Sequence, residues 1–212
     1  MHGLAISMAL WGTVIGALFG GWPTEKFGRR KTLLWIGILY FVSAIGSAFA
    51  TEVYSFMIAR FIGGIGVGVS TVAAPLYISE IAPAKDRGKL AGLFQFNIVF
   101  GILIAFLSNA LLSGIGENVW RWILGLEAFP ALVYAVLCFR LPESPRWLIT
   151  HGKDREGGIA VFRRINPAAS ETELNAIADK VAASVSKTDS NRTGFFAAVD
   201  EAHFTGFPNR LF

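Results

Sequence analysis

The feature that most constrains this chain is a series of five apolar stretches, each long enough to cross a lipid bilayer as a helix. About 18 to 20 residues, at 1.5 Å per residue, span roughly 30 Å of hydrocarbon. The sequence is 53% hydrophobic and 16% charged, which is more apolar than a soluble domain of this size. It therefore predicts an all-α membrane protein with five transmembrane helices, over residues 4–22, 32–50, 54–78, 90–112 and 120–141.

The basic residues alternate between the turns that join these stretches. The first, third and fifth turns are basic, whereas the second and fourth carry no Lys or Arg; the basic side chains include Lys26, Arg29, Arg30, Lys31, Lys85, Arg87, Lys89, Arg140 and Arg146. Cytoplasmic turns are enriched in Lys and Arg, so we expect the basic turns to face the cytoplasm of a cell whose inner (plasma) membrane holds the chain. This explains the net charge of +4 better than nucleic-acid binding does.

That orientation places the N-terminus outside and the C-terminus in the cytoplasm. The outside end would then consist of only three residues, Met1 to Gly3. We therefore expect a further helix upstream that this sequence does not contain.

Three polar residues fall within the apolar stretches, namely Arg60, Gln95 and Glu127. A charge at membrane depth costs about 2.5–3.5 kcal/mol or more near the bilayer centre, so it usually faces a cavity or a partner. Arg60 could instead extend to the outer interface, whereas Arg60 and Glu127 would neutralise each other if their helices adjoin. The Gln95 amide can hydrogen-bond either to the hydroxyl groups of a ligand or to a polar group of a neighbouring helix. Pro75 and Pro130 can bend helices at a cavity.

Glycines recur every fourth residue in the first and third stretches. They are Gly12, Gly16 and Gly20, followed by Gly64 and Gly68. Small residues at this spacing let two helix backbones approach closely in a membrane. We expect this to serve packing within the bundle, with a dimerisation face as the alternative.

No enzyme, metal or cofactor signature is present. There is no Gly-rich phosphate loop, no nucleophile beside a base, and no Cys/His spacing, since Cys138 is the single cysteine. An intramembrane enzyme would need paired aspartates or a Ser/His pair at membrane depth, which the sequence lacks. We expect no catalytic residues, no bound metal and no cofactor.

Four segments in order resemble the sugar porters of the major facilitator superfamily. They are residues 21–30, residues 60–68, residues 75–83 followed by Arg87-Gly88, and Pro142-Glu143-Ser144-Pro145-Arg146-Trp147-Leu148. The first departs from the family pattern by having Glu25 where an aspartate is usual. The resemblance covers residues 1 to about 186 and implies that the five helices are helices 2–6 of the family's N-terminal half. The first helix of that half and the whole C-terminal half are absent from the chain.

The resemblance also implies roles for the polar residues of the membrane. Gln95 matches a glutamine that hydrogen-bonds sugar hydroxyls. Arg60 and Glu127 match a charged pair that, in bacterial proton-coupled members, works with an aspartate on the first helix. Because Glu127 is present, the chain resembles bacterial xylose–proton symporters more than animal facilitators.

The same resemblance implies a cytoplasmic latch of charged residues, which in the family holds the two halves in the outward-open state. Its candidates are Glu25, Arg29, Arg30, Glu80, Arg87, Glu143 and Arg146. The alternative is that these are solvated loop charges, which contribute about 0–1 kcal/mol per pair.

The tail has a different composition from the apolar stretches. Residues 153–165 predict a helix, and Ser170 with Glu173 forms a capping-box pattern at the start of an amphipathic helix. We expect a transmembrane bundle over residues 1–148, an intracellular helical segment over 149–188 and a poorly ordered tail over 189–212.

The expected function is transport of a monosaccharide by alternating access, coupled to a proton in the full-length carrier. The implied partners are a monosaccharide, a proton, the lipid bilayer, the missing first helix and the C-terminal half, with no nucleic acid. The alternative is a non-transporting membrane fragment, which is inert or acts only by associating with another transporter half.

Overall fold

The computed structural model describes residues 2–83, 85–112, 119–152, 154–167 and 169–184. Throughout these ranges the regular secondary structure is helical. The helices are α1 (His2–Phe19), α2 (Gly21–Phe27), α3 (Arg29–Phe49), α4 (Val53–Ile81), α5 (Arg87–Leu112), α6 (Val119–Leu126), α7 (Ala128–Arg140), α8 (Pro145–Thr150) and α9 (Arg155–Ile165), followed by a helix over residues 171–184. The predicted tail over 189–212 lies outside the described residues.

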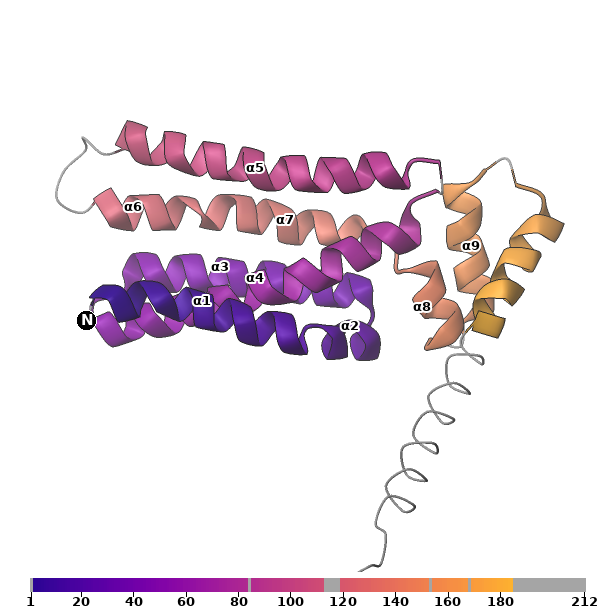
Figure 1. Cartoon of the computed structure of the whole chain (residues 1–212), viewed down its shortest axis with the longest axis horizontal. Coiled ribbons are helices and arrows are strands. Elements are labelled where there is room, and N and C mark those ends of the chain that lie inside the picture. The colour runs from indigo at the N-terminus through magenta and orange to yellow at the C-terminus, as the bar shows by residue number, and fades with distance from the viewer. Residues whose placement is uncertain (1, 84, 113–118, 153, 168, 185–212) are drawn as a thin grey trace, which may run out of the picture.

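Four of the five predicted membrane-length helices are present at full length, and the first is shorter than predicted. Arg29–Phe49, Val53–Ile81, Arg87–Leu112 and Val119–Arg140 are each long and apolar enough to cross a membrane, and a shorter apolar helix covers Ser7–Phe19. The long helices lie side by side (Figure 1), and the three basic turns lie at the same end of the bundle as α2 and α8. We call this the α2–α8 end.

The polar run after the first apolar stretch is helical, so its description as a turn was wrong. Residues Gly21–Phe27 form α2, and α3 begins at Arg29, three residues before the predicted start of the second helix. Pro23 is tolerated because it lies in the first turn of α2, where its missing N–H has no helical partner. Only Gly28 interrupts the helices, with φ of 94° and ψ of 162°, a conformation that is essentially restricted to glycine.

The glycines of α1 and α4 bring the two backbones into direct contact, which confirms packing within the bundle. A Cβ atom on Gly64 would collide with the carbonyl oxygen of Ala9, and one on Gly68 with that of Thr13. In the opposite direction, a Cβ on Gly12 would collide with the carbonyl oxygen of Phe61. Contact this close allows many dispersion interactions between two helices that gain little from the hydrophobic effect in lipid.

The buried core lies between α3, α4 and α7. Leu33, Ile36, Val69, Tyr77 and Cys138 are among its members, each at most 9% exposed. This core fixes the long helices that carry Arg60 and Glu127 relative to one another.

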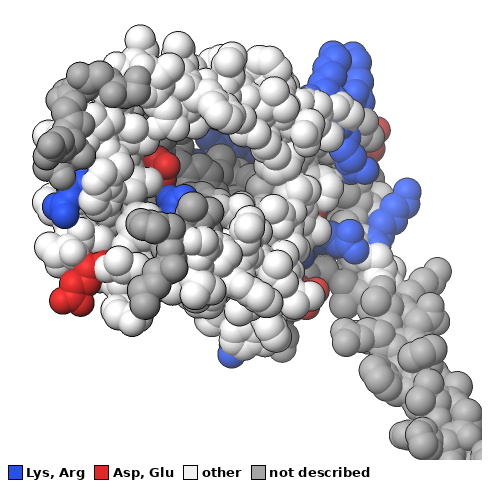
Figure 2. Space-filling view, turned by 60° about the vertical axis from the view of Figure 1, so that its left-hand side comes forward, with Lys and Arg blue, Asp and Glu red and all other residues white. Residues whose placement is uncertain are grey.

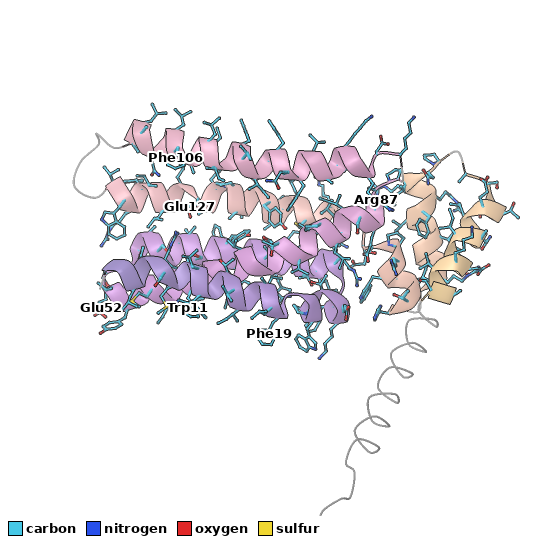
Figure 3. The ribbon with its side chains drawn as sticks, viewed as in Figure 1. Trp11, Phe19, Glu52, Arg87, Phe106 and Glu127 are labelled. Atoms are coloured by element: carbon cyan, nitrogen blue, oxygen red, sulfur yellow. The ribbon has the colours of Figure 1, made fainter. Side chains whose placement is uncertain are left out.

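Helix α5 packs differently from the other long helices. None of its residues is buried, and its main contacts are with α4 and α6, its neighbours in sequence. Most of its large apolar side chains are exposed, and Phe106, at 70% exposure, is labelled in Figure 3. Helix α5 therefore lacks the partners that bury α3 and α4.

The helices after α7 begin with side-chain caps. Ser144 accepts a hydrogen bond from the N–H of Trp147 at the start of α8, a helix that the sequence analysis did not predict. The predicted capping box is confirmed, since the N–H of Ser170 donates to Glu173 (2.9 Å) and the N–H of Glu173 donates to the Ser170 hydroxyl (3.3 Å). The helix that follows buries Leu174 and Ala178.

Candidate functional site

A cavity of about 450 Å³ lies between α1, α3, α4 and the α6–α7 pair. Its wall is mainly small or apolar, and its polar side chains are Thr13, Tyr40, Ser43, Arg60, Glu127 and Tyr134. Figure 2 shows that the molecule is hollowed among uncharged side chains, with acidic and basic atoms at the hollow. A pocket of this size and lining suits a small ligand that is held by a few polar groups.

Arg60 and Glu127 meet in this cavity. The Nη1 atom of Arg60 lies 3.8 Å from Oε2 of Glu127, and their side chains are 33% and 57% exposed. The structure therefore favours the pairing that the sequence left open over extension of Arg60 alone to an interface. The distance is that of a loose ion pair, so both charged groups keep donor and acceptor positions for a ligand or a further partner.

Pro130 explains why Glu127 stands at an interruption in the helix. Proline has no N–H to donate to the carbonyl of Leu126, four residues earlier, and the pair α6 and α7 divides between Leu126 and Ala128. The break is slight, because the N–H of Ala131 still donates to the carbonyl of Glu127 at 3.3 Å. Figure 3 places Glu127 at this join. Pro130 lines the cavity, as predicted for a bend, whereas Pro75 lies within continuous α4.

Two tyrosines form an aromatic part of the cavity wall. The rings of Tyr40 and Tyr134 lie 6.4 Å apart at 59°, and the Tyr40 hydroxyl hydrogen-bonds to that of Ser70 at 3.0 Å. Aromatic faces beside polar groups are suited to a ligand that is both polar and carbon-rich. Sequence reasoning did not identify either tyrosine, because aromatic residues inside apolar stretches give no signal of their own.

Gln95 is not brought together with the charged pair. It lies on α5, where its side chain is exposed, and it is not among the residues that line the cavity. Its predicted contact with a sugar stays a prediction.

A second cluster of polar residues lies at the α2–α8 end. The Arg29 guanidinium donates to both carboxylate oxygens of Glu80, at 2.9 and 3.0 Å, and these side chains are 8% and 4% exposed. The Ser144 hydroxyl donates to Glu80 at 2.6 Å. A buried pair of this kind differs from the solvated loop charges that were the alternative, because both ions depend on each other for neutralisation.

Glu143 belongs to the same cluster and is bonded to the backbone at the start of α3. Its Oε1 atom accepts hydrogen bonds from the backbone N–H groups of Arg29 (2.8 Å), Arg30 (3.0 Å) and Ser144 (3.0 Å). A carboxylate at the first N–H groups of α3 satisfies donors that lack helical partners and complements the helix dipole. A Cβ atom at Gly28 would lie 2.6 Å from Oε2 of Glu143, so glycine is required there by space as well as by backbone conformation.

Two further bonds tie the ends of the helices together. The Tyr77 hydroxyl of α4 donates to the carbonyl of Pro142 at 2.8 Å. The indole N–H of Trp147 donates to the carbonyl of Glu25 at 2.7 Å. Glu25 therefore joins the cluster through its backbone, while its side chain is exposed.

The side chains of the remaining latch candidates, Arg30, Arg87 and Arg146, lie outside this bonded core. Arg30 reaches the carbonyl of Phe139 at 2.6 Å, which joins α3 to α7. The side chains of Arg87 and Arg146 are exposed, and Figure 3 places Arg87 at the start of α5. The structure thus gathers Arg29, Glu80 and Glu143, but not Arg87 or Arg146.

Ser144 is the cluster member that sequence reasoning missed. It lay inside a recognised segment, directly before a proline, and a serine followed by proline is a common start for a helix. That signal predicts the cap of α8, but no local pattern predicts the bond to Glu80, 64 residues away in sequence.

A metal centre has no candidate in the described part of the chain, where no group of three or more His, Cys, Asp or Glu side chains could hold an ion.

Comparison with known proteins gives consistent matches over most of the chain. The family model described as "Sugar (and other) transporter" matches residues 1–206. The chain is 41% identical over 179 residues to the "Probable inositol transporter 2" of Arabidopsis thaliana, covering 84% of this chain and 30% of that protein. It is 37% identical over 187 residues to the "D-xylose-proton symporter" of Escherichia coli strain K12, covering 77% and 38% respectively.

Solved structures agree with these matches. A partially occluded, inward-open form of the xylose transporter XylE from E. coli has a TM-score of 0.80 at 34% identity, over 88% of this chain and 48% of that one. The form of the same proton:xylose symporter bound to 6-bromo-6-deoxy-D-glucose has a TM-score of 0.78 at 32% identity, over 96% and 44%. The chain therefore spans less than half the length of the relatives that it matches.

Proposed function

Because the chain belongs to the sugar (and other) transporter family, we propose that it forms part of a carrier that moves a monosaccharide or a related polyol by alternating access. The relatives named above are transporters of inositol or xylose rather than enzymes, and they are multi-pass membrane proteins. The observation that carries the proposal is the meeting of Arg60 and Glu127 in a cavity between helices that the rest of the bundle holds in place.

The charged pair supplies the coupling between a proton and the substrate. An ionised carboxylate in a cavity within the membrane is expensive unless a cation lies beside it. When the carrier changes from one open state to the other, any movement of Arg60 relative to Glu127 changes that cost. Glu127 then binds a proton where Arg60 is distant and releases it where Arg60 is near.

The partners of the chain in this proposal are the first helix of the N-terminal half and the whole C-terminal half. The open cavity and the unburied α5 support this, because both lack the helix packing that covers α3 and α4. In the complete carrier, Gln95 of α5 would face the sugar across the same space. The buried cluster around Arg29 and Glu80 would form the fixed side of a latch in the cytoplasmic layer.

The proposal is tested with a chimera of the E. coli D-xylose-proton symporter in which residues 1–186 of this chain replace the matching segment. We expect proteoliposomes with the chimera to accumulate labelled D-xylose when a proton gradient is applied. Glu127→Gln should lower accumulation at least tenfold while leaving exchange of labelled for unlabelled xylose. The matched control is Glu52→Gln, which changes an exposed carboxylate outside the cavity. Equal loss in both variants would contradict the role of Glu127.

The chain by itself should show no active uptake, since alternating access needs two halves that rock about a shared site. Gradient-driven accumulation of sugar by proteoliposomes that contain only this chain would refute that expectation. Association without transport, the alternative function, is favoured by α5 alone, because an apolar helix with no buried residue requires other helices or lipid around it.

A further inference from the structure

A second cavity, of about 390 Å³, lies at the junction of α2, α3 and α4. We call it the α2–α3 groove. Representative lining residues are Pro23, Phe27, Trp35, Leu39, Ile65 and Val69. Its lining is apolar apart from Thr32, whose hydroxyl already donates to the carbonyl of Gly28 at 2.8 Å. Thr32 is engaged, and the indole N–H of Trp35 is the one other side-chain donor of the lining, so the part of a ligand that enters is mainly hydrocarbon.

The mouth of the groove carries aromatic rings and a cation. Phe27 and Trp35 are 44% and 60% exposed at the groove, and Trp22 on α2 is 63% exposed. The Nζ atom of Lys26 lies 4.7 Å from the ring centre of Trp22 and 5.6 Å from that of Phe27. Trp and Lys at the end of a membrane helix mark the level of the lipid head groups.

A second lysine lies at the same level on α3. Lys31 precedes Trp35 by four residues, so the two side chains lie one above the other on one face of the helix. Lys31 is exposed and lies nearer than Trp35 to the α2–α8 end. Glu25 is the exposed acid next to Lys26, which leaves the groove mouth with a net positive charge.

We propose that the α2–α3 groove binds one anionic phospholipid, with an acyl chain against Trp35 and Leu39 and its phosphate beside Lys26 and Lys31. The apolar lining selects the hydrocarbon, and the two lysines complement the negative head group. Each lysine near a membrane surface favours an anionic lipid by roughly fivefold, so two give a preference of about 25-fold over a zwitterionic lipid.

The test is native mass spectrometry of the full chain in detergent, titrated with phosphatidylglycerol or with phosphatidylcholine of the same acyl chains. We expect phosphatidylglycerol to bind about 25-fold more tightly. Lys26→Gln with Lys31→Gln should reduce its affinity to that of phosphatidylcholine. The matched control is Lys85→Gln with Lys89→Gln, which removes two exposed lysines, one from the α4–α5 turn and one from the first turn of α5, at the same end of the bundle. This control should keep the preference.

Two outcomes would overturn the proposal. One is equal binding of the two lipids by the unchanged chain. The other is an equal loss of preference in both double variants, which would show that total charge rather than the groove selects the lipid. A further variant, Leu39→Trp, fills the groove and should weaken both lipids severalfold; unchanged binding would place the lipid elsewhere.

Discussion

Arg29 and Glu80 form a bidentate ion pair that is almost fully enclosed, although 51 residues separate them in sequence. The pair joins the start of α3 to the last turn of α4. Removing one partner of such a pair costs about 3–5 kcal/mol, because the other charge is left buried without compensation. The pair therefore controls whether these two helix ends stay together.

We expect Glu80→Gln to destabilise the chain by about 3–5 kcal/mol. Cys138 is the single cysteine and is 1% exposed, so reaction with a thiol dye during heating reports unfolding directly. The control is Asp86→Asn, which removes the acid of an exposed pair with Lys89 and should change stability by less than about 1 kcal/mol. Equal losses would mean that Arg29 finds another partner.

Gly28→Ala should destabilise the chain by about 1–3 kcal/mol from backbone strain alone, with a further loss because its Cβ would press on Glu143. The dye assay on Cys138 measures this as well. Gly21→Ala is the control, since Gly21 is helical and a Cβ there meets nothing within 4 Å. A stable Gly28→Ala protein would show that the α2–α3 junction adopts another backbone conformation.

Gly68→Ala should force α1 and α4 apart, because the added methyl group would overlap the backbone of Thr13. Overpacking of this kind costs about 1–3 kcal/mol. The same substitution at Gly101 of α5 meets open space and should be neutral or slightly stabilising. If both variants unfold at the same temperature, the α1–α4 contact does not contribute to stability.

The orientation of the chain can be tested with single cysteines in intact cells. Thr51 lies in the short turn between α3 and α4, so the thiol of the Thr51→Cys variant should react with a membrane-impermeant maleimide. Lys31→Cys, at the α2–α8 end, should react only after the cells are opened. Buried Cys138 gives little background labelling. The reverse pattern would place the basic turns outside and overturn the predicted orientation.

The membrane-length helices could be predicted because hydrocarbon thickness sets a length that any apolar helix must meet. The secondary structure of the polar run over residues 21–31 was harder to predict. Its charge marked the end of a span correctly, but charge does not distinguish a turn from a short helix such as α2. Gly28 is the only true interruption, and a single glycine among other polar residues gives a weak signal.

The meeting of Arg60 and Glu127 was predicted as a condition, namely that their helices adjoin, and the structure meets that condition. The hydrogen bond between Ser144 and Glu80 could not be predicted from the sequence, because it depends on how the α7–α8 connection packs on α4. For Gln95, the structure does not show the contact that its residue type suggested. Its residue type suggested a role in binding, but type alone does not bring α5 against the cavity.

Direct backbone contact between α1 and α4 has a mechanical consequence. Because glycines lie where the helices cross, no flexible side chains separate the two main chains there, and none can adjust if one helix slides along the other. We expect these two helices to move as one rigid body. In the carrier proposed above, a rocking motion would then displace Thr13 and Arg60 together, whereas α5, none of whose residues is buried, would shift independently.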